Sequence, residues 1–157
     1  MKALSPIQYA RLMLRNANKT EDRVQDALRR VADRGAVMAK ARTREMDLVD
    51  TGGFAASWRG EDRGDSAAAV VNTKPYAPYV DDGQPPGNPP PLAVLIRWVE
   101  RRLGLGGHQA WAAARTIQQH IDERGTAAAK ITKWLGEKLK PLAEKEVAKE
   151  LEKEFRK

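Results

Sequence analysis

A proline-rich segment in the middle of the chain restricts the fold more than any other feature of the sequence. Residues 83–91 contain five prolines and two glycines. Proline lacks the backbone N–H that a helix or a central strand requires, so this segment can form neither. We therefore expect an extended, exposed loop from Gln84 to Pro91, and the two flanks of this loop carry different side-chain patterns.

The first 47 residues carry a helical pattern. Ser5 and Pro6 are typical of a helix start, and a short opening helix is expected to end between Asn16 and Lys19. A longer helix should follow from Thr20, which can cap it. Its apolar positions recur at steps of three and four, at Val24, Leu28, Val31, Gly35 and Met38. One face of this helix should therefore join the core.

The residues between this helix and the proline-rich loop have β character. A turn sequence at residues 50–53 leads into a short helical step that ends at Ser57-Trp58. Ala67–Thr73 has the small and β-branched residues of a strand, and the charged residues 59–66 should form the loop of a hairpin. Strand character continues over residues 76–80. The middle third therefore predicts a small antiparallel β-sheet.

Helical periodicity returns after the loop. One amphipathic helix is expected over residues 92–103, and a second, antiparallel to it, from about Gln109 to Arg124. A third helix, capped by Thr126, should end or kink at Pro141. The predicted fold class is therefore α+β, with a long N-terminal helix, a small antiparallel β-sheet in the middle and a helical C-terminal third.

The last 16 residues differ from the rest in composition. Residues 142–157 are dominated by Glu and Lys, with a thin apolar stripe at Val147, Leu151 and Phe155. We assign residues 1–141 to a single domain and residues 142–157 to a charged C-terminal helical extension. So narrow a stripe suits docking on the chain's own domain and docking on a neighbouring subunit equally well.

Charge is distributed unevenly along the 157 residues. The net charge is +7, but residues 1–47 carry +5, residues 48–91 carry −3 and residues 92–157 carry +5. Acidic and basic regions of this kind favour contacts between subunits or a basic face along DNA. The chain has no Cys, which fits assembly in a reducing cytoplasm, and no stretch approaches the length of a membrane span.

Residues with catalytic potential do not form a recognisable pattern. His108 and His120 match no zinc spacing, and no Gly-x-Ser-x-Gly motif is present. Turn carboxylates such as Asp81 and Asp82 are expected to be solvated. We predict no enzyme activity, no cofactor and no metal. Several helical arginines could hold DNA phosphates without reading sequence, namely Arg11, Arg15, Arg29, Arg30, Arg34, Arg97, Arg101 and Arg102.

Short segments of the chain, in order, resemble a known phage family. Residues 48–52 are similar to its Pro-Val-Asp-Thr-Gly turn, Ser57-Trp58 to the end of its next helical step, and residues 76–83 to its Tyr-Ala-Pro-Tyr-Val-Glu-x-Gly segment. Residues 88–99 and 121–126 also match variants. The family is that of neck or tail-completion proteins of tailed phages, also called minor tail or virion-morphogenesis proteins, which are encoded between head-closure and tail-terminator genes. The signature residues are Asp50, Thr51, Gly52, Trp58, Tyr76, Pro78, Tyr79, Val80 and Gly83.

The resemblance implies a structural subunit of the virion. Such a subunit would form a homo-oligomeric ring at the head–tail junction, between head-closure or connector proteins and tail-terminator or tail-tube proteins, and would be needed for tail completion. Trp58, Tyr76 and Tyr79 are expected to be packing anchors. Contacts between subunits are expected from the loop and the terminal helix, at Pro85, Pro86, Pro89, Pro90, Val147, Leu151 and Phe155.

Two other functions remain open from the sequence. The protein could be the tail terminator, a ring that caps the tail tube. It could instead be a small, basic, non-specific DNA-binding protein, whose affinity would fall steeply as salt rises. In the neck interpretation, contact with DNA would be limited to the lumen of the ring.

Overall fold

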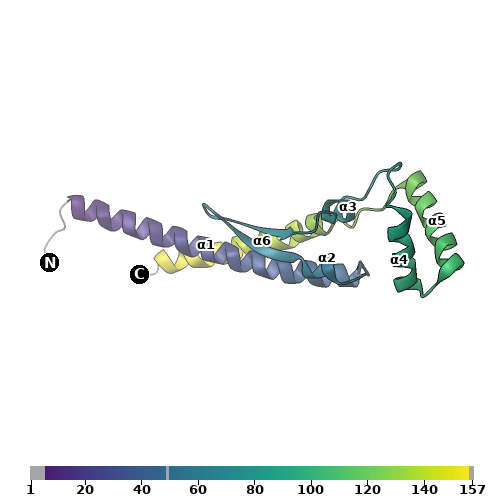
Figure 1. Cartoon of the computed structure of the whole chain (residues 1–157). Coiled ribbons are helices and arrows are strands. Elements are labelled where there is room, and N and C mark those ends of the chain that lie inside the picture. Colours follow the sequence, from purple (N-terminus) through teal and green to yellow (C-terminus); the bar gives the residue numbers. More distant parts are fainter. Residues whose placement is uncertain (1–5, 49, 156–157) are drawn as a thin grey trace. The chain divides into compact units, whose positions relative to one another are not determined.

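The computed structural model describes residues 6–48 and 50–155, with side chains described from residue 7 to residue 153 apart from residue 49. In chain order the elements are α1 (Pro6–Glu45), α2 (Gly53–Ala56), β1 (Trp58–Gly64), β2 (Ala67–Asn72), α3 (Ala77–Asp81), α4 (Leu92–Leu103), α5 (Gly107–Arg124) and α6 (Ile131–Phe155) (Figure 1). The predicted α+β class is confirmed, with its long N-terminal helix, central antiparallel hairpin and helical C-terminal third.

The chain forms two compact units. The first contains α1 as far as Ala39, the hairpin from Trp58 to Val71 and α6 from Trp134. The second contains residues 40–57 and 72–133. Each unit has its own packing, and each is described by itself.

Helix α1 is one continuous helix of 40 residues, so the predicted break between Asn16 and Lys19 is wrong. Those residues include neither proline nor glycine, and their weak helix preference does not stop a helix. The Thr20 hydroxyl donates a hydrogen bond to the Asn16 carbonyl at 3.0 Å, which is a contact inside a helix and not a cap. Ser5, the other half of the predicted helix start at Pro6, lies outside the described residues.

The hairpin differs from its prediction in the position of the turn. The charged residues expected to form the loop belong to strand β1, and the turn consists of Asp65 and Ser66 alone. Both residues have positive φ, at 46° and 57°, the conformation that a tight two-residue hairpin turn requires. Charged side chains are common on edge strands, because they face solvent there. The charge of these residues therefore does not distinguish a strand from a loop.

The core of the first unit lies where α1, β2 and α6 meet. A Cβ at Gly35 would lie 2.7 Å from both a Leu139 methyl and a Val70 methyl, so the glycine lets these side chains approach the helix closely. Val31 and Ala36 of α1 are also buried. The predicted apolar stripe of this helix is therefore part of the core.

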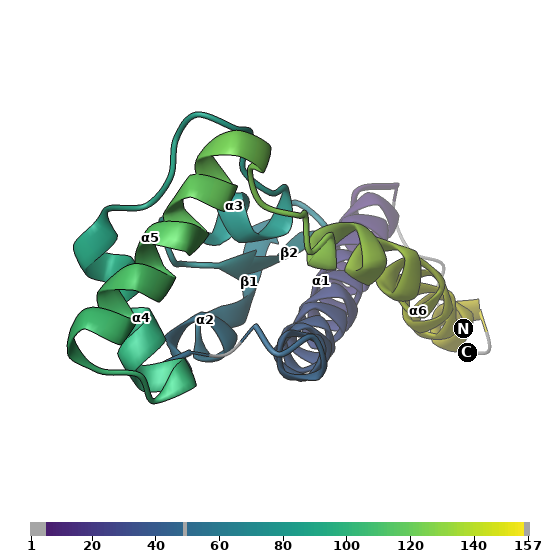
Figure 2. The same ribbon diagram turned by 90° about the vertical axis from the view of Figure 1, so that its right-hand side faces the viewer.

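In the second unit, α4 and α5 form the predicted antiparallel pair (Figure 2). Their contact buries Leu95, Val99, Ala110 and Ala114. Strand character was also predicted at residues 76–80, but that prediction is wrong because these residues lie at and within the short helix α3. A proline in the first turn of α3 favours helix over strand there.

Helix α6 passes through Pro141 without ending, so the expected end of the helix is wrong, whereas the alternative of a kink stays a prediction. The turns beyond the proline make ion pairs with α1, which are described below. The boundary between a domain of residues 1–141 and an extension of residues 142–157 stays a prediction.

Candidate assembly surfaces

The signature segment of residues 76–83, which includes α3, is hydrogen-bonded to the first residues of α6. Asp81 is buried, and its carboxylate accepts hydrogen bonds from the backbone N–H of Ile131 at 2.6 Å and of Thr132 at 3.1 Å, and from the Thr132 hydroxyl. This is an N-cap supplied by a residue 50 positions away in the chain. The expectation that Asp81 is a solvated turn carboxylate is wrong, as is the expectation that Thr126 caps α6.

Gly83 allows a close backbone crossing next to this cap. Its φ is +77°, and a Cβ here would lie 2.5 Å from the Thr126 carbonyl oxygen and 3.0 Å from the Ala128 nitrogen. The neighbouring Gln84 exchanges backbone hydrogen bonds with Thr126, at 3.3 and 2.8 Å. A glycine at this signature position is therefore required by the fold, and Thr126 takes part in strand-like pairing.

The aromatic signature residues of this segment are not buried. Tyr76 is 45% exposed and Tyr79 is 56% exposed, although the Tyr76 ring lies 6.0 Å from the Phe54 ring, between centroids. Pro78 is exposed within α3, and Val80 is half-buried. The tyrosines therefore differ from the expected packing anchors, and they line a surface.

That surface is an apolar groove of the second unit, which we call the proline groove. It consists of two cavities of about 680 and 570 Å³. The residues common to both cavities are Leu48, Tyr76, Val80 and Pro90. Pro89 and Pro90 are half-buried in its lining, whereas Pro85 and Pro86 are exposed. The loop is thus extended as predicted, and part of it forms a wall.

The signature turn after α1 is fixed by ion pairs. Arg101 donates to both Asp50 carboxylate oxygens, from Nε at 3.2 Å and from Nη2 at 2.5 Å, and Arg102 pairs with Asp47 at 2.5 Å. The hydrogen bonds from Arg101 lower the pKa of Asp50 and raise the pKa of the guanidinium. Sequence reasoning placed both arginines on a solvated or phosphate-binding face and so missed this role.

The other signature residues of this region have structural positions. Gly52 has φ +79° and precedes α2, while Thr51 is exposed beside the proline groove. Trp58 is 3% exposed, which agrees with its expected role as a packing anchor. Val49, the remaining residue of the turn motif, lies outside the described residues.

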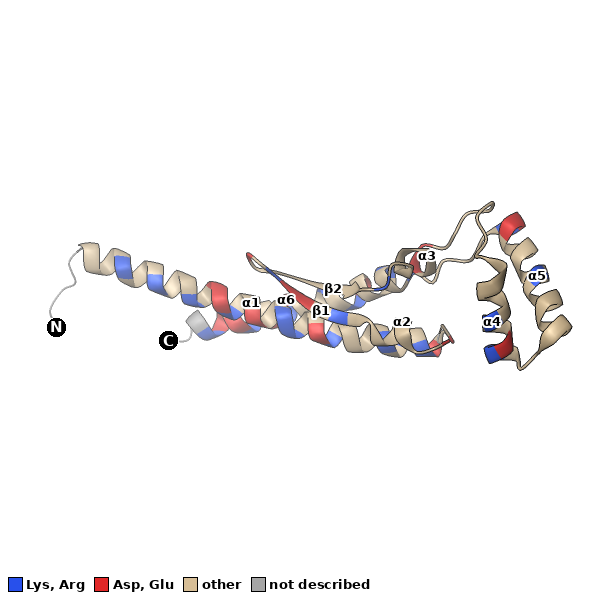
Figure 3. Ribbon diagram, viewed as in Figure 1, with Lys and Arg blue, Asp and Glu red and all other residues tan. Residues whose placement is uncertain are grey.

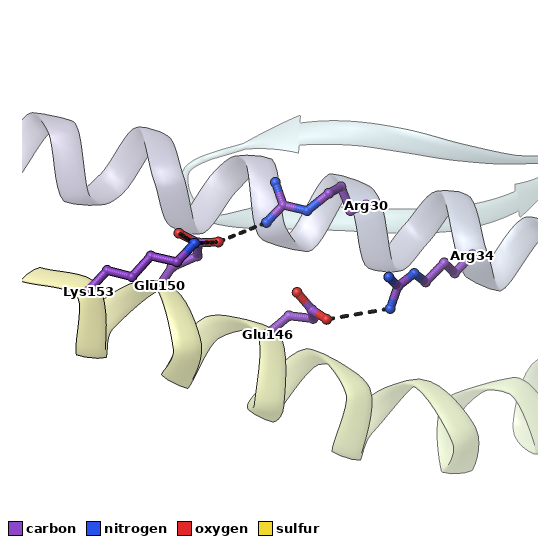
Figure 4. Close-up of polar contacts among 5 residues, drawn as sticks. All are labelled: Arg30, Arg34, Glu146, Glu150 and Lys153. Atoms are coloured by element: carbon purple, nitrogen blue, oxygen red, sulfur yellow. Dashed lines mark hydrogen bonds and ion pairs between the residues drawn. The ribbon is translucent and has the colours of Figure 1, made fainter.

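In the first unit the charged C-terminal helix pairs with α1 (Figure 4). Arg30 binds Glu150 at 3.1 Å and Arg34 binds Glu146 at 3.5 Å. Lys153 also holds Glu150, at 2.9 Å, and its hydrogen bond is the main cause of the lowered pKa of Glu150. Residues beyond Pro141 therefore pack on the chain's own α1.

This packing leaves little of the terminal apolar stripe for a neighbour. Val147 is half-buried within the unit, whereas Leu151 is 37% exposed. The side chain of Phe155 lies outside the described residues. Contacts of these three residues with another subunit stay a prediction.

A larger apolar surface lies at the other end of α1. Residues 7–19, which we call the N-terminal arm, are exposed at every position. The large apolar side chains are 39–67% exposed, and they are Ile7, Tyr9, Leu12, Met13 and Leu14. Arg11, Arg15 and Lys19 make the arm basic (Figure 3). Among the described residues, nothing covers residues 7–19, a feature that the sequence pattern did not reveal.

Groups that could perform chemistry are scattered. Among the described residues no cluster of three or more His, Cys, Asp or Glu could hold a metal. The ring of His108 lies 5.9 Å from that of Trp111, between centroids, on a surface of α5. No described helix is both long and apolar enough to span a membrane.

The surfaces described above, an exposed apolar arm and an apolar groove, are of the kind that bind other chains. Residues 11–83 match the family model described as "Bacteriophage HK97-gp10, putative tail-component". The predicted resemblance to a tailed-phage neck and tail-completion family is thereby confirmed. The matched part spans most of α1, the hairpin and the signature segment as far as Gly83, whereas the similar segments at 88–99 and 121–126 lie outside it. No curated protein and no solved structure matches the chain.

Proposed function

We propose that this protein is a structural subunit of the phage neck, which forms a ring at the head–tail junction and is needed for tail completion or head–tail joining. The main support is the match to the tail-component family model over residues 11–83. These residues include most of the exposed arm and all the signature residues from Asp50 to Gly83. The family suggests a structural component of the phage tail or neck and not an enzyme.

The surfaces support the role of a subunit in an assembly. Exposed apolar patches on a protein that acts alone are small, and larger ones mark contacts with partners. This chain has the arm in one unit and the proline groove in the other. Repeated heterologous contacts close a ring when the rotation per subunit is right. Neighbouring head-closure or tail-terminator rings are the partners we propose for the remaining surfaces.

Ion pairing makes DNA binding a weaker candidate than the charge suggests. Arg30, Arg34, Arg101 and Arg102 are paired with carboxylates of the chain. Phosphate contacts would require them to exchange these partners. Non-specific contact with DNA in the lumen would therefore fall to other exposed cations, such as Arg11, Arg15 and Lys19 of the arm.

A deletion strain tests the proposed function. Without the gene, electron microscopy should show filled heads and separate tails of normal length, and a plasmid copy should restore joined particles. Tails of abnormal length would instead identify a tail terminator, because a terminator ring stops growth of the tube. Normal, infectious particles from the deletion strain would refute both roles.

A further inference from the structure

The N-terminal arm carries an ordered apolar stripe. Apolar residues recur in the arm at alternating steps of three and four. They are Ile7, Ala10, Leu14 and Ala17. The same spacing continues, interrupted by Glu21, into Leu28 and the buried Val31. A stripe with this heptad spacing faces another helix or a groove between elements. In the arm that face meets nothing that the structure describes.

The first unit also has an apolar groove with no occupant, which we call the α6 groove. Its volume is about 220 Å³, below the roughly 300 Å³ at which small-molecule pockets begin. It is suited to side chains of a helix. Its walls come from α1, β2 and α6, and they include Leu28, Val31, Ala68, Val70, Gly136 and Leu139.

No contact among the described residues explains the glycine at position 136 in this wall. Glycine inside a helix is about 1 kcal/mol less favourable than alanine. At Gly35 this cost has a reason, because Leu139 and Val70 fill the space where a Cβ would stand. At Gly136, apart from its chain neighbours and the nearby backbone of α6, no atom of the described residues lies within 4 Å of that position, and the residue is exposed. A missing side chain beside an open apolar groove fits the close approach of another backbone.

The arm cannot fill the α6 groove of its own chain. The arm and the groove residue Leu28 belong to the same continuous helix α1, so the arm points away along the helix axis. We infer that the N-terminal arm of one copy docks its apolar stripe into the α6 groove of the next copy. This contact is heterologous and therefore compatible with a closed ring. The inference rests on the proposed function, since it names the contact that joins the ring.

Matched leucines in the arm provide the first test. Leu14 lies on the stripe, and Leu12 lies about 200° around the helix from it; both are exposed. Leu14→Glu should weaken self-association of the purified full-length chain at least about tenfold in analytical ultracentrifugation. Leu12→Glu should leave it within about threefold of wild type. Equal effects of the two substitutions would overturn the inference, as would a wild-type chain that stays monomeric.

The groove side is tested by Gly136→Lys, with Gly136→Ala as its control. Lysine should weaken self-association at least about tenfold, because its long charged side chain would occupy the groove. Alanine adds only a methyl and should have a clearly smaller effect. Both replacements favour helix, so circular dichroism should show folded chains. Unchanged association of the lysine variant would contradict docking in the groove.

Cross-linking separates the possible partners. The chain has no Cys, so single cysteines can be introduced without a background. A Leu14→Cys chain mixed with a Gly136→Cys chain should give mixed dimers with a bismaleimide reagent. Dimers of Leu14→Cys alone would show pairing between arms, and the absence of dimers would show no docking; either result overturns the inference. The proposed neck function would survive both, because the deletion strain tests it independently.

Discussion

Asp81 provides the sharpest test of the packing described above. Replacing it by Ala removes a helix cap, which costs about 1 kcal/mol, and leaves the N–H of the buried Ile131 without its acceptor, which costs about 2 kcal/mol more. We expect a loss of about 3 kcal/mol in the free energy of unfolding. For a chain of this length, the melting temperature should fall by about 6–12 °C.

The assay is thermal and urea unfolding followed by circular dichroism, with Asp82→Ala as the matched control. Asp82 is the exposed neighbour, and its loss should change stability by less than about 0.5 kcal/mol. Asp81→Asn keeps one acceptor oxygen and should fall between Asp81→Ala and wild type. If Asp81→Ala and Asp82→Ala unfolded at the same temperature, the assignment of Asp81 as the cap of α6 would be refuted.

Three further substitutions test other contacts. Gly83→Ala should lower the free energy of unfolding by at least about 2 kcal/mol, because a positive φ strains alanine and the Thr126 carbonyl leaves no room for a Cβ. A variant as stable as wild type in urea unfolding would contradict this. Asp50→Asn should cost less than about 1 kcal/mol at neutral pH, because the pair is partly exposed, and a larger loss measured by urea unfolding would show a deeper role. Glu150→Gln should cost about 1 kcal/mol. Folding lowers the pKa of Glu150, so the stabilisation by this carboxylate should be complete above its ordinary pKa of 4.5. It should disappear as the pH falls through the lower pKa of the folded chain. A difference in stability between Glu150→Gln and wild type that persisted at about pH 2 would contradict this.

Local patterns predicted much of the secondary structure. The bounds of α4 follow from the apolar stripe between Leu92 and Leu103 and from the glycines after it. Gly104 adopts the αL conformation that commonly ends a helix, so the end of α4 is visible in the sequence. The long α1 was divided wrongly at Asn16, since weak helix formers in sequence do not reveal whether a helix continues.

Contacts distant in sequence were not predictable from patterns. The cap from Asp81 to α6 and the pair of Asp50 with Arg101 join residues 50 and 51 positions apart. Each member alone looks like an ordinary turn or surface residue. The bare arm was also missed, because periodicity shows that a face is apolar and not whether anything covers it.

The signature segments illustrate what a resemblance adds. Tyr76, Pro78 and Gly83 belong to the signature, and the structure explains Gly83 by the close backbone crossing beside Thr126. Tyr76 and Pro78 are largely at the surface, where the first lines the proline groove. Exposed positions of this kind suit contacts with other subunits, and this role stays a proposal.

Quantitative mass spectrometry of purified virions tests the central claim most directly. A structural neck subunit should be present in every mature particle at a fixed number of copies relative to a connector protein, and it should remain after salt washing. Abundance in infected cells together with absence from purified particles would contradict the claim.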